Sequence, residues 1–103
     1  MKVLNPRSGE ADYAITPASR DDIAREAARL RGNQPAWRAL GADGRAAVLL
    51  RWADAIDAHA DGIADRLSVD TGRIAIARIE VAGVAGTMRR WAARAPDIIA
   101  GLD

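Results

Sequence analysis

The residues that could do chemistry in this chain are few, and they do not converge. His59 is the single histidine of the sequence, and there is no cysteine. A general base needs a nucleophile or a substrate group within reach, and no pattern around His59 supplies one. The lack of cysteine excludes a thiolate nucleophile, a disulfide and a cysteine-based zinc site. We therefore predict no catalytic residue in this chain and interpret His59 as a structural side chain.

Four aspartates recur at helical spacing in the middle of the sequence: Asp54, Asp57, Asp61 and Asp65. Calcium sites usually gather six or more oxygen ligands in a loop. Helical two-metal sites combine glutamates with a Glu-x-x-His pattern on several helices. Neither pattern occurs in the sequence. We therefore predict a solvated acidic face and no metal site.

Two glycine-containing stretches invite comparison with phosphate-binding loops: Arg7-Ser8-Gly9-Glu10 and Gly83-Val84-Ala85-Gly86. A dinucleotide fingerprint needs G-x-G-x-x-G between a strand and a helix, and a P-loop ends in Gly-Lys-Ser/Thr. Neither stretch has such a pattern. We predict that this chain alone binds neither NAD nor NADP and has no cofactor-binding residue.

Length and composition limit what else the chain can be. Its 103 residues are 50% hydrophobic but only 4% aromatic, which predicts one domain with a thin, alanine-rich core. The net charge of +1, with acids and bases interspersed, gives no argument for a nucleic-acid or membrane partner. The sequence has neither a signal-peptide pattern nor the roughly 20 apolar residues of a membrane span. We expect a cytoplasmic protein.

The stretch from 45 to 72 is the segment around which the other elements must be arranged. Six apolar residues recur there at spacings of three and four, which predicts one buried helical stripe: Leu49, Trp52, Ile56, Ala60, Ile63 and Leu67. Gly72 is placed to end the helix in a left-handed conformation. A helix-interior glycine and repelling aspartates weaken the stretch near Ala60. We predict one long helix or two helices that break there.

Local signals organise the residues before this stretch. Turn formers separate two short extended pieces within residues 1–17, which predicts a hairpin. Ser19 is a good N-cap for the next helix, and Asp21 and Arg25 are spaced for an ion pair. Pro35 should kink or end that helix near Asn33. Asp43 is the expected N-cap of the central stretch.

The segment from 74 to 88 is apolar on most sides and has only two charged residues. A helix of this kind is normally buried on more than one side, so the sequence predicts an uncovered surface. The expected association face consists of Val81, Val84, Met88 and Trp91. Pro96 should end this helix. We predict a mostly α fold in which residues 1–103 form one unit, with an extended hairpin at 1–17 and three to four amphipathic helices at 18–103.

Five local patterns, in this order, resemble the start of aldehyde dehydrogenases. They are NPRSGE at 5–10 for the family's NPxTGE, QPAW at 34–37, RAAVLLRWAD at 45–54 for R-x-x-x-L-x-x-x-A-D, DTGR at 70–73 for E-T-G-K, and EV with MRRWA at 80–92 for E-V…L-R-Y-Y-A. No single pattern is diagnostic, but all five are in register. The match covers essentially this whole chain and about the first fifth of the family's chain.

The resemblance implies a fragment of the family's NAD-binding domain, a hairpin and a helical layer that precede the dinucleotide site, the catalytic cysteine and the general base. It implies a parent reaction in which NAD or NADP oxidises an aldehyde to a carboxylic acid through a thiohemiacetal. It also makes Ile79 and Gly83 candidates for the border of the substrate tunnel. The family's tyrosine pair is Arg90-Trp91 here, so the tunnel lining differs.

We therefore interpret the chain as a non-catalytic N-terminal segment of such an enzyme, whose partner is the rest of an aldehyde dehydrogenase chain. The rival hypothesis is a stand-alone helical module, derived from that family, that associates with itself or with another protein. A third hypothesis is a small helical ligand-binding protein.

Overall fold

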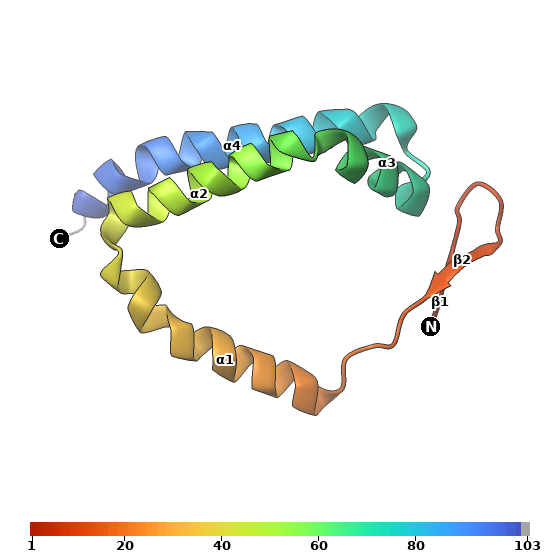
Figure 1. The fold of residues 1–103 in the computed structure, drawn as a ribbon, viewed down its shortest axis with the longest axis horizontal. Coiled ribbons are helices and arrows are strands. Elements are labelled where there is room, and N and C mark those ends of the chain that lie inside the picture. The colour runs from red at the N-terminus through yellow and green to blue at the C-terminus, as the bar shows by residue number, and fades with distance from the viewer. Residues whose placement is uncertain (102–103) are drawn as a thin grey trace.

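The computed structural model describes residues 1–101, and they form a short hairpin followed by four helices (Figure 1). The elements are β1 (Lys2–Leu4), β2 (Ala11–Ala14), α1 (Arg20–Ala39), α2 (Gly41–Ala58), α3 (Ala60–Thr71) and α4 (Ile74–Ala100). The predicted mostly α fold with an N-terminal hairpin is confirmed.

The hairpin is built by a tight turn that satisfies its own polar groups. β1 and β2 pair antiparallel with Val3 opposite Tyr13. In the turn, Asn5 Oδ1 accepts from the backbone N–H of Arg7 at 2.9 Å, and the carbonyl of Asn5 accepts from Gly9 N–H at 2.8 Å. Gly9 has φ +75°, a conformation that glycine adopts without a steric penalty. The predicted turn formers are therefore the residues that make the turn.

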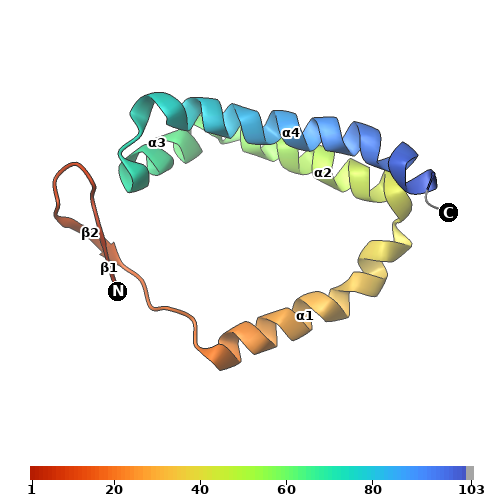
Figure 2. The same ribbon diagram turned by 180° about the vertical axis from the view of Figure 1, so that it is seen from behind.

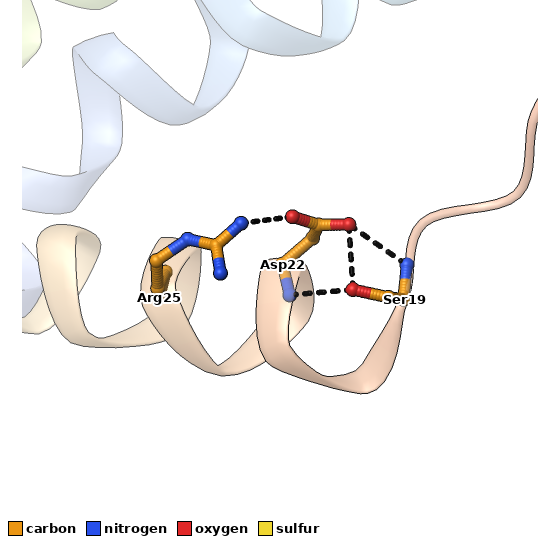
Figure 3. Close-up of polar contacts among 3 residues, drawn as sticks. All are labelled: Ser19, Asp22 and Arg25. Carbon is orange, nitrogen blue, oxygen red and sulfur yellow. Dashed lines mark hydrogen bonds and ion pairs between the residues drawn. The ribbon is translucent and has the colours of Figure 1, made fainter.

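The N-terminus of α1 carries a reciprocal cap, shown in Figure 3. Ser19 Oγ accepts from the backbone N–H of Asp22 at 3.1 Å, and Asp22 Oδ2 accepts from Ser19 N–H at 3.0 Å. The predicted Ser19 cap is confirmed. The predicted pair of Asp21 with Arg25 is wrong, because Arg25 bonds to Asp22. The cap holds the Asp22 carboxylate so that its second oxygen faces Arg25.

Neither internal proline ends its helix. α1 continues through Pro35 to Ala39, and α4 continues through Pro96 to Ala100, so both expected stops are wrong. Pro35 leaves the carbonyl of Arg31 without its helical donor, but Arg31 is exposed and water can replace that donor. Around Pro96 the last turns of α4 pack beside Trp37 and the start of α2, and such packing outweighs local propensity.

The central stretch divides into two helices, which is the second of the two predicted alternatives. α2 ends at Ala58, His59 lies between the helices, and α3 begins at Ala60. Gly72 ends α3 with φ +71°, which also confirms its predicted role. The expected Asp43 N-cap is wrong: α2 begins two residues earlier, at Gly41, and Asp43 lies in the first turn. There its charge favours the positive end of the helix dipole.

The core of the described residues is a seam of small side chains between α4 and the α2–α3 pair. The buried residues are Ala53, Ala64, Ala77, Val81, Ala85 and Ala92. The prediction that Trp52 lies in a buried stripe is wrong, since its side chain is 60% exposed. The other two tryptophans do not fill this core either: Trp91 is 59% exposed and Trp37 is half-buried. Consecutive residues lie about 100° apart around a helix, so burial of Ala53 turns Trp52 outward.

The helices enclose an open shape. Figures 1 and 2 show α2 and α4 side by side, with α1 swung away from them and the hairpin beside the end of α3. The radius of gyration is 18.0 Å and the principal extents are 53 × 37 × 21 Å. α1 has no buried residue. Within residues 1–101, no helix combines the length and the apolar character needed to cross a membrane.

Candidate functional site

An open apolar groove of about 730 Å³ runs along one side of the seam, between α4 and the α2–α3 pair. Its apolar lining comes from all three helices: Ile56, Ile63, Leu67, Val81, Val84 and Met88. Trp52 lies one turn before Ile56 on α2, and Trp91 lies one turn after Met88 on α4. Residues three and four apart share a helix face, so both tryptophans extend the apolar surface beyond the groove. We call this surface, from Trp52 and Trp91 to Leu67, the apolar face.

The four residues of the expected association face divide by depth. Val81 is buried against α3, and Met88 is half-buried in the groove. Val84 is 51% exposed and Trp91 59% exposed. Of these four residues, Val84 and Trp91 are therefore the ones exposed on the apolar face, whereas Val81 is buried beneath it.

The two candidate tunnel residues lie one turn apart on α4. Gly83 lines the groove, and an added Cβ there would meet no atom within 4 Å. Ile79 is 68% exposed and lies outside the groove. Both are accessible in this chain.

The opposite side of the seam is charged. Arg89 of α4 bonds through Nη2 to Asp54 Oδ1 and to Asp57 Oδ2 of α2, each at 2.7 Å. These bonds, to Asp54 first and then to Asp57, raise the pKa of Arg89. Arg78 of α4 lies 3.5 Å from Asp61 of α3. The predicted aspartate row is therefore solvent-exposed, and three of its members, Asp54, Asp57 and Asp61, also form ion pairs with α4. No local sequence signal reveals a partner 35 residues away.

The remaining candidates have structural roles. His59 Nδ1 lies 2.8 Å from the carbonyl oxygen of Ala55, so its ring closes the last turn of α2. In the part of the chain that the structure describes, no three histidine, aspartate or glutamate side chains are grouped to hold a metal ion.

The hairpin is fixed to the end of α3 by contacts that sequence reasoning missed. Tyr13 donates its hydroxyl proton to Asp70 Oδ1 at 3.1 Å, which raises the pKa of Tyr13. The guanidinium of Arg66 lies 5.9 Å from the centre of the Tyr13 ring. A Cβ added to Gly72 would lie 3.1 Å from Cγ of Pro6. Gly72 therefore serves both the left-handed turn and this close approach.

Comparison with known proteins decides the family. The sequence model of the aldehyde dehydrogenase family matches residues 1–101. This chain belongs to the aldehyde dehydrogenase family. It matches the N-terminal segment of that family, as the five sequence patterns predicted.

Curated aldehyde dehydrogenases are similar to this chain over 82 residues. The relatives include N-succinylglutamate 5-semialdehyde dehydrogenases of Burkholderia mallei (strain SAVP1) and Burkholderia pseudomallei (strains 668 and K96243), each 35% identical. The matched stretch is 79% of this chain and 17% of each relative. This aldehyde dehydrogenase chain therefore spans only about a sixth of the length of those relatives. The comparison with solved structures gave no significant match.

Two patterns of the aldehyde dehydrogenase resemblance meet in space. The NPRSGE turn supplies Pro6 and the DTGR segment supplies Gly72, and these two residues are in contact. Asp70, the first residue of DTGR, is also the acceptor for Tyr13. The two patterns are therefore the two sides of one corner that joins the hairpin to α3.

The glycines named in the sequence analysis and the first turns of α1, α2 and α3 do not form a cradle for the pyrophosphate of NAD(P). A pyrophosphate is usually held by free backbone N–H groups at a helix N-terminus, but acidic side chains lie in the first turns of α1, α2 and α3. Gly83 and Gly86 lie inside α4, so their N–H groups belong to the helical ladder. Gly9 donates its N–H to Asn5. A dinucleotide cradle must therefore involve residues other than these.

Proposed function

We propose that this chain is a non-catalytic docking layer of a cytoplasmic, NAD(P)-dependent aldehyde dehydrogenase. Its apolar face packs on the part of the enzyme that holds the dinucleotide, the catalytic cysteine and the general base. The chain contributes shape and stability to that enzyme, and no reacting group.

The observation that carries this proposal is the excess of exposed surface. The accessible surface is 7961 Å² for a mass of 10.9 kDa, whereas a compact monomer of that mass exposes about 5,600 Å². The radius of gyration of 18.0 Å likewise exceeds the roughly 13 Å of a compact 103-residue domain. The surplus of about 2,400 Å² matches what one partner contributes to a large obligate interface.

The distribution of side chains supports the apolar face as the docking surface. The apolar face carries exposed Trp52, Ile63, Val84 and Trp91, and contiguous apolar surface of this kind marks an interaction site. The other side of the seam is occupied by the ion pairs of Arg89, which are compatible with water. We therefore assign the docking contact to the apolar face.

The same proposal extends to substrate. The relatives are named for N-succinylglutamate 5-semialdehyde, which makes that aldehyde the first substrate to test for an enzyme containing this layer. Ile79 and Gly83 then border its substrate tunnel, because both are accessible on α4. Ile79→Ala, at a position outside the docking groove, should change the KM for the aldehyde and leave the KM for NAD(P) unchanged.

Complementation tests the docking layer. The chain is co-expressed with the Burkholderia pseudomallei relative from which the matching segment has been deleted. We expect the two polypeptides to co-purify and to form NAD(P)H from the semialdehyde, whereas each alone is inactive. Activity of the deleted relative alone, or failure of the two to bind, would contradict the proposal.

A charge placed on the apolar face provides the matched pair of variants. Val84→Glu puts a carboxylate at the groove, whereas Ala47→Glu puts the same charge on an exposed position of α2 outside the groove, on the helix face of Arg51 and Asp54. We expect Val84→Glu to abolish co-purification and Ala47→Glu to leave it intact. Equal binding by both variants would show that another surface makes the contact.

Self-association is the second candidate function, favoured by the exposure of Val84 and Trp91 on α4. A symmetric dimer through the apolar face would bury the same residues in the isolated chain. Sedimentation velocity should then show concentration-dependent association that Val84→Glu weakens without loss of helical circular dichroism. A folded monomer at high concentration would rule out this alternative.

A further inference from the structure

The buried contact between α2 and α4 is made by small side chains, which do little to fix how far one helix is shifted along the other. The buried residues between α2 and α4 are Ala53 on α2 and Ala85 and Ala92 on α4, with Leu49 and Ile56 of α2 half-buried beside them. Ala77 and Val81 of α4 pack instead with Ala64 of α3. Register between helices is normally set by large side chains that insert into holes of the facing helix. An alanine ends in a single methyl group, so a seam of alanines discriminates weakly between neighbouring registers.

Arg89 supplies a directional contact across this smooth seam. Its Nη2 atom lies 2.7 Å from Asp54 Oδ1 and 2.7 Å from Asp57 Oδ2. The two aspartates are three residues apart, so one guanidinium bridges consecutive turns of α2. Among residues 1–101, these are the ion pairs that join α2 to α4. Arg89 is half-buried, whereas Asp54 and Asp57 are exposed.

We propose that Arg89 is a positioning residue that sets the register of α4 along α2. A slip of one turn displaces the helix by about 5.4 Å, which separates the guanidinium from at least one of the two carboxylates. Exposed ion pairs contribute little to stability. A polar contact can nevertheless select one register without adding much net stability, because only the difference in free energy between the registers matters. The inference concerns geometry within this chain and holds whichever partner covers the apolar face.

The neighbouring arginine is a matched control. Arg90 Nη2 bonds to Thr87 Oγ1 at 2.8 Å, and Thr87 belongs to the same helix. Arg90 is exposed, and among the described residues it has no ion pair with α2. Arg89→Gln and Arg90→Gln therefore make the same change of charge at adjacent positions, but only the first removes the contact between helices.

Spin labels can report the register directly, because the chain contains no native cysteine. Ala47→Cys on α2 and Ala82→Cys on α4, both at exposed positions, carry the labels in the full chain. Double electron–electron resonance should give one narrow distance population in this labelled parent and in Arg90→Gln. Arg89→Gln should add a population shifted by about 5 Å, one helical turn.

Three further measurements distinguish a change of register from a general loss of structure. The exchange Asp54→Lys with Arg89→Glu, made together with Asp57→Asn so that no carboxylate faces the new glutamate, should restore the single population. Asp57→Asn, which removes one acceptor and keeps Arg89, should broaden the distribution with unchanged circular dichroism. In the labelled parent, about 1 M salt shortens the screening length to about 3 Å and should produce the shifted population. An unchanged distribution in Arg89→Gln and Asp57→Asn, or a broad one in the labelled parent, would overturn the proposal.

Discussion

The arm α1 and the pair of α2 with α4 are all regular helices, but different forces stabilise them. α1 has no buried residue and has strong local devices, namely the cap of Ser19 with Asp22 and an ion pair between Glu26 and Arg29. Neither α2 nor α4 has a side-chain cap at its N-terminus. These two helices depend on the buried alanine seam. Interactions between residues close in sequence thus stabilise α1, whereas tertiary packing stabilises the pair of α2 and α4.

This difference teaches where each helix is vulnerable. A change at the cap should alter α1 and leave the pair intact, whereas a change in the seam should separate α2 from α4 and leave α1 intact. The local signals for the arm are visible in the sequence, and the seam becomes visible only when two segments meet.

The largest expected effect comes from overfilling the seam. Ala53 is fully buried, so Ala53→Leu should destabilise the pair by about 1–3 kcal/mol. Ala55→Leu adds the same atoms on an exposed part of α2 and should change the free energy of unfolding little. Urea melts followed by circular dichroism compare the two variants. Equal midpoints would mean that the seam does not hold the pair.

The next effect tests the arm. Ser19→Ala removes the cap of α1 and should cost about 1 kcal/mol of local helix stability. Hydrogen exchange read helix by helix should show faster exchange in α1 and no change in α4. Ser19→Asn, which can still accept from the first turn, should retain most of the protection. Faster exchange in α4 as well would show that the arm and the pair unfold together.

Acid should also act on the arm first. The hydroxyl and backbone N–H of Ser19, followed by Arg25, hold the pKa of Asp22 below its usual value of 3.8. A carboxyl with a lowered folded-state pKa stabilises the helix fully above the ordinary value and loses this contribution as the pH falls below it. Helicity of α1 should therefore decrease below about pH 3.8. Asp22→Asn should lack this step, and an identical acid transition in that variant would contradict the assignment.

The smallest expected effect is at Trp52. Its side chain is 60% exposed, and surface substitutions usually change stability by no more than about 0.5 kcal/mol. Trp52→Ala should therefore leave the urea midpoint of the isolated chain almost unchanged. It should still weaken co-purification with the rest of the enzyme, because Trp52 belongs to the apolar face. A large loss of intrinsic stability would show that Trp52 packs within the chain.

The features that could be predicted are those encoded by neighbouring residues. The hairpin turn, the Ser19 cap, the break near Ala60 and the left-handed Gly72 all follow from local backbone preferences. The apolar stripe was predicted correctly at Ile56, Ala60 and Leu67, which pack against the core. It was wrong at Trp52, because hydrophobicity favours Trp52 while close helix approach favours Ala53. The continuation through Pro35 and Pro96 likewise depends on solvent and packing around each proline.

The candidate site was only partly predictable for the same reason. The apolar character of α4 indicated that a surface is left uncovered, and Val84 and Trp91 are exposed on it. The contacts of Arg89 with Asp54 and Asp57, and of Tyr13 with Asp70, join residues 32 to 57 positions apart. No periodicity or spacing rule connects such residues before the chain is folded.

The alanine seam has a consequence for how the chain responds to temperature. The heat-capacity change of unfolding grows with the apolar area that becomes exposed, and is typically about 12–15 cal/mol/K per residue. A seam of methyl groups beside an already exposed apolar face releases little new apolar area when it opens. The isolated chain should therefore have an unusually small heat-capacity change, and its stability curve should be shallow and broad.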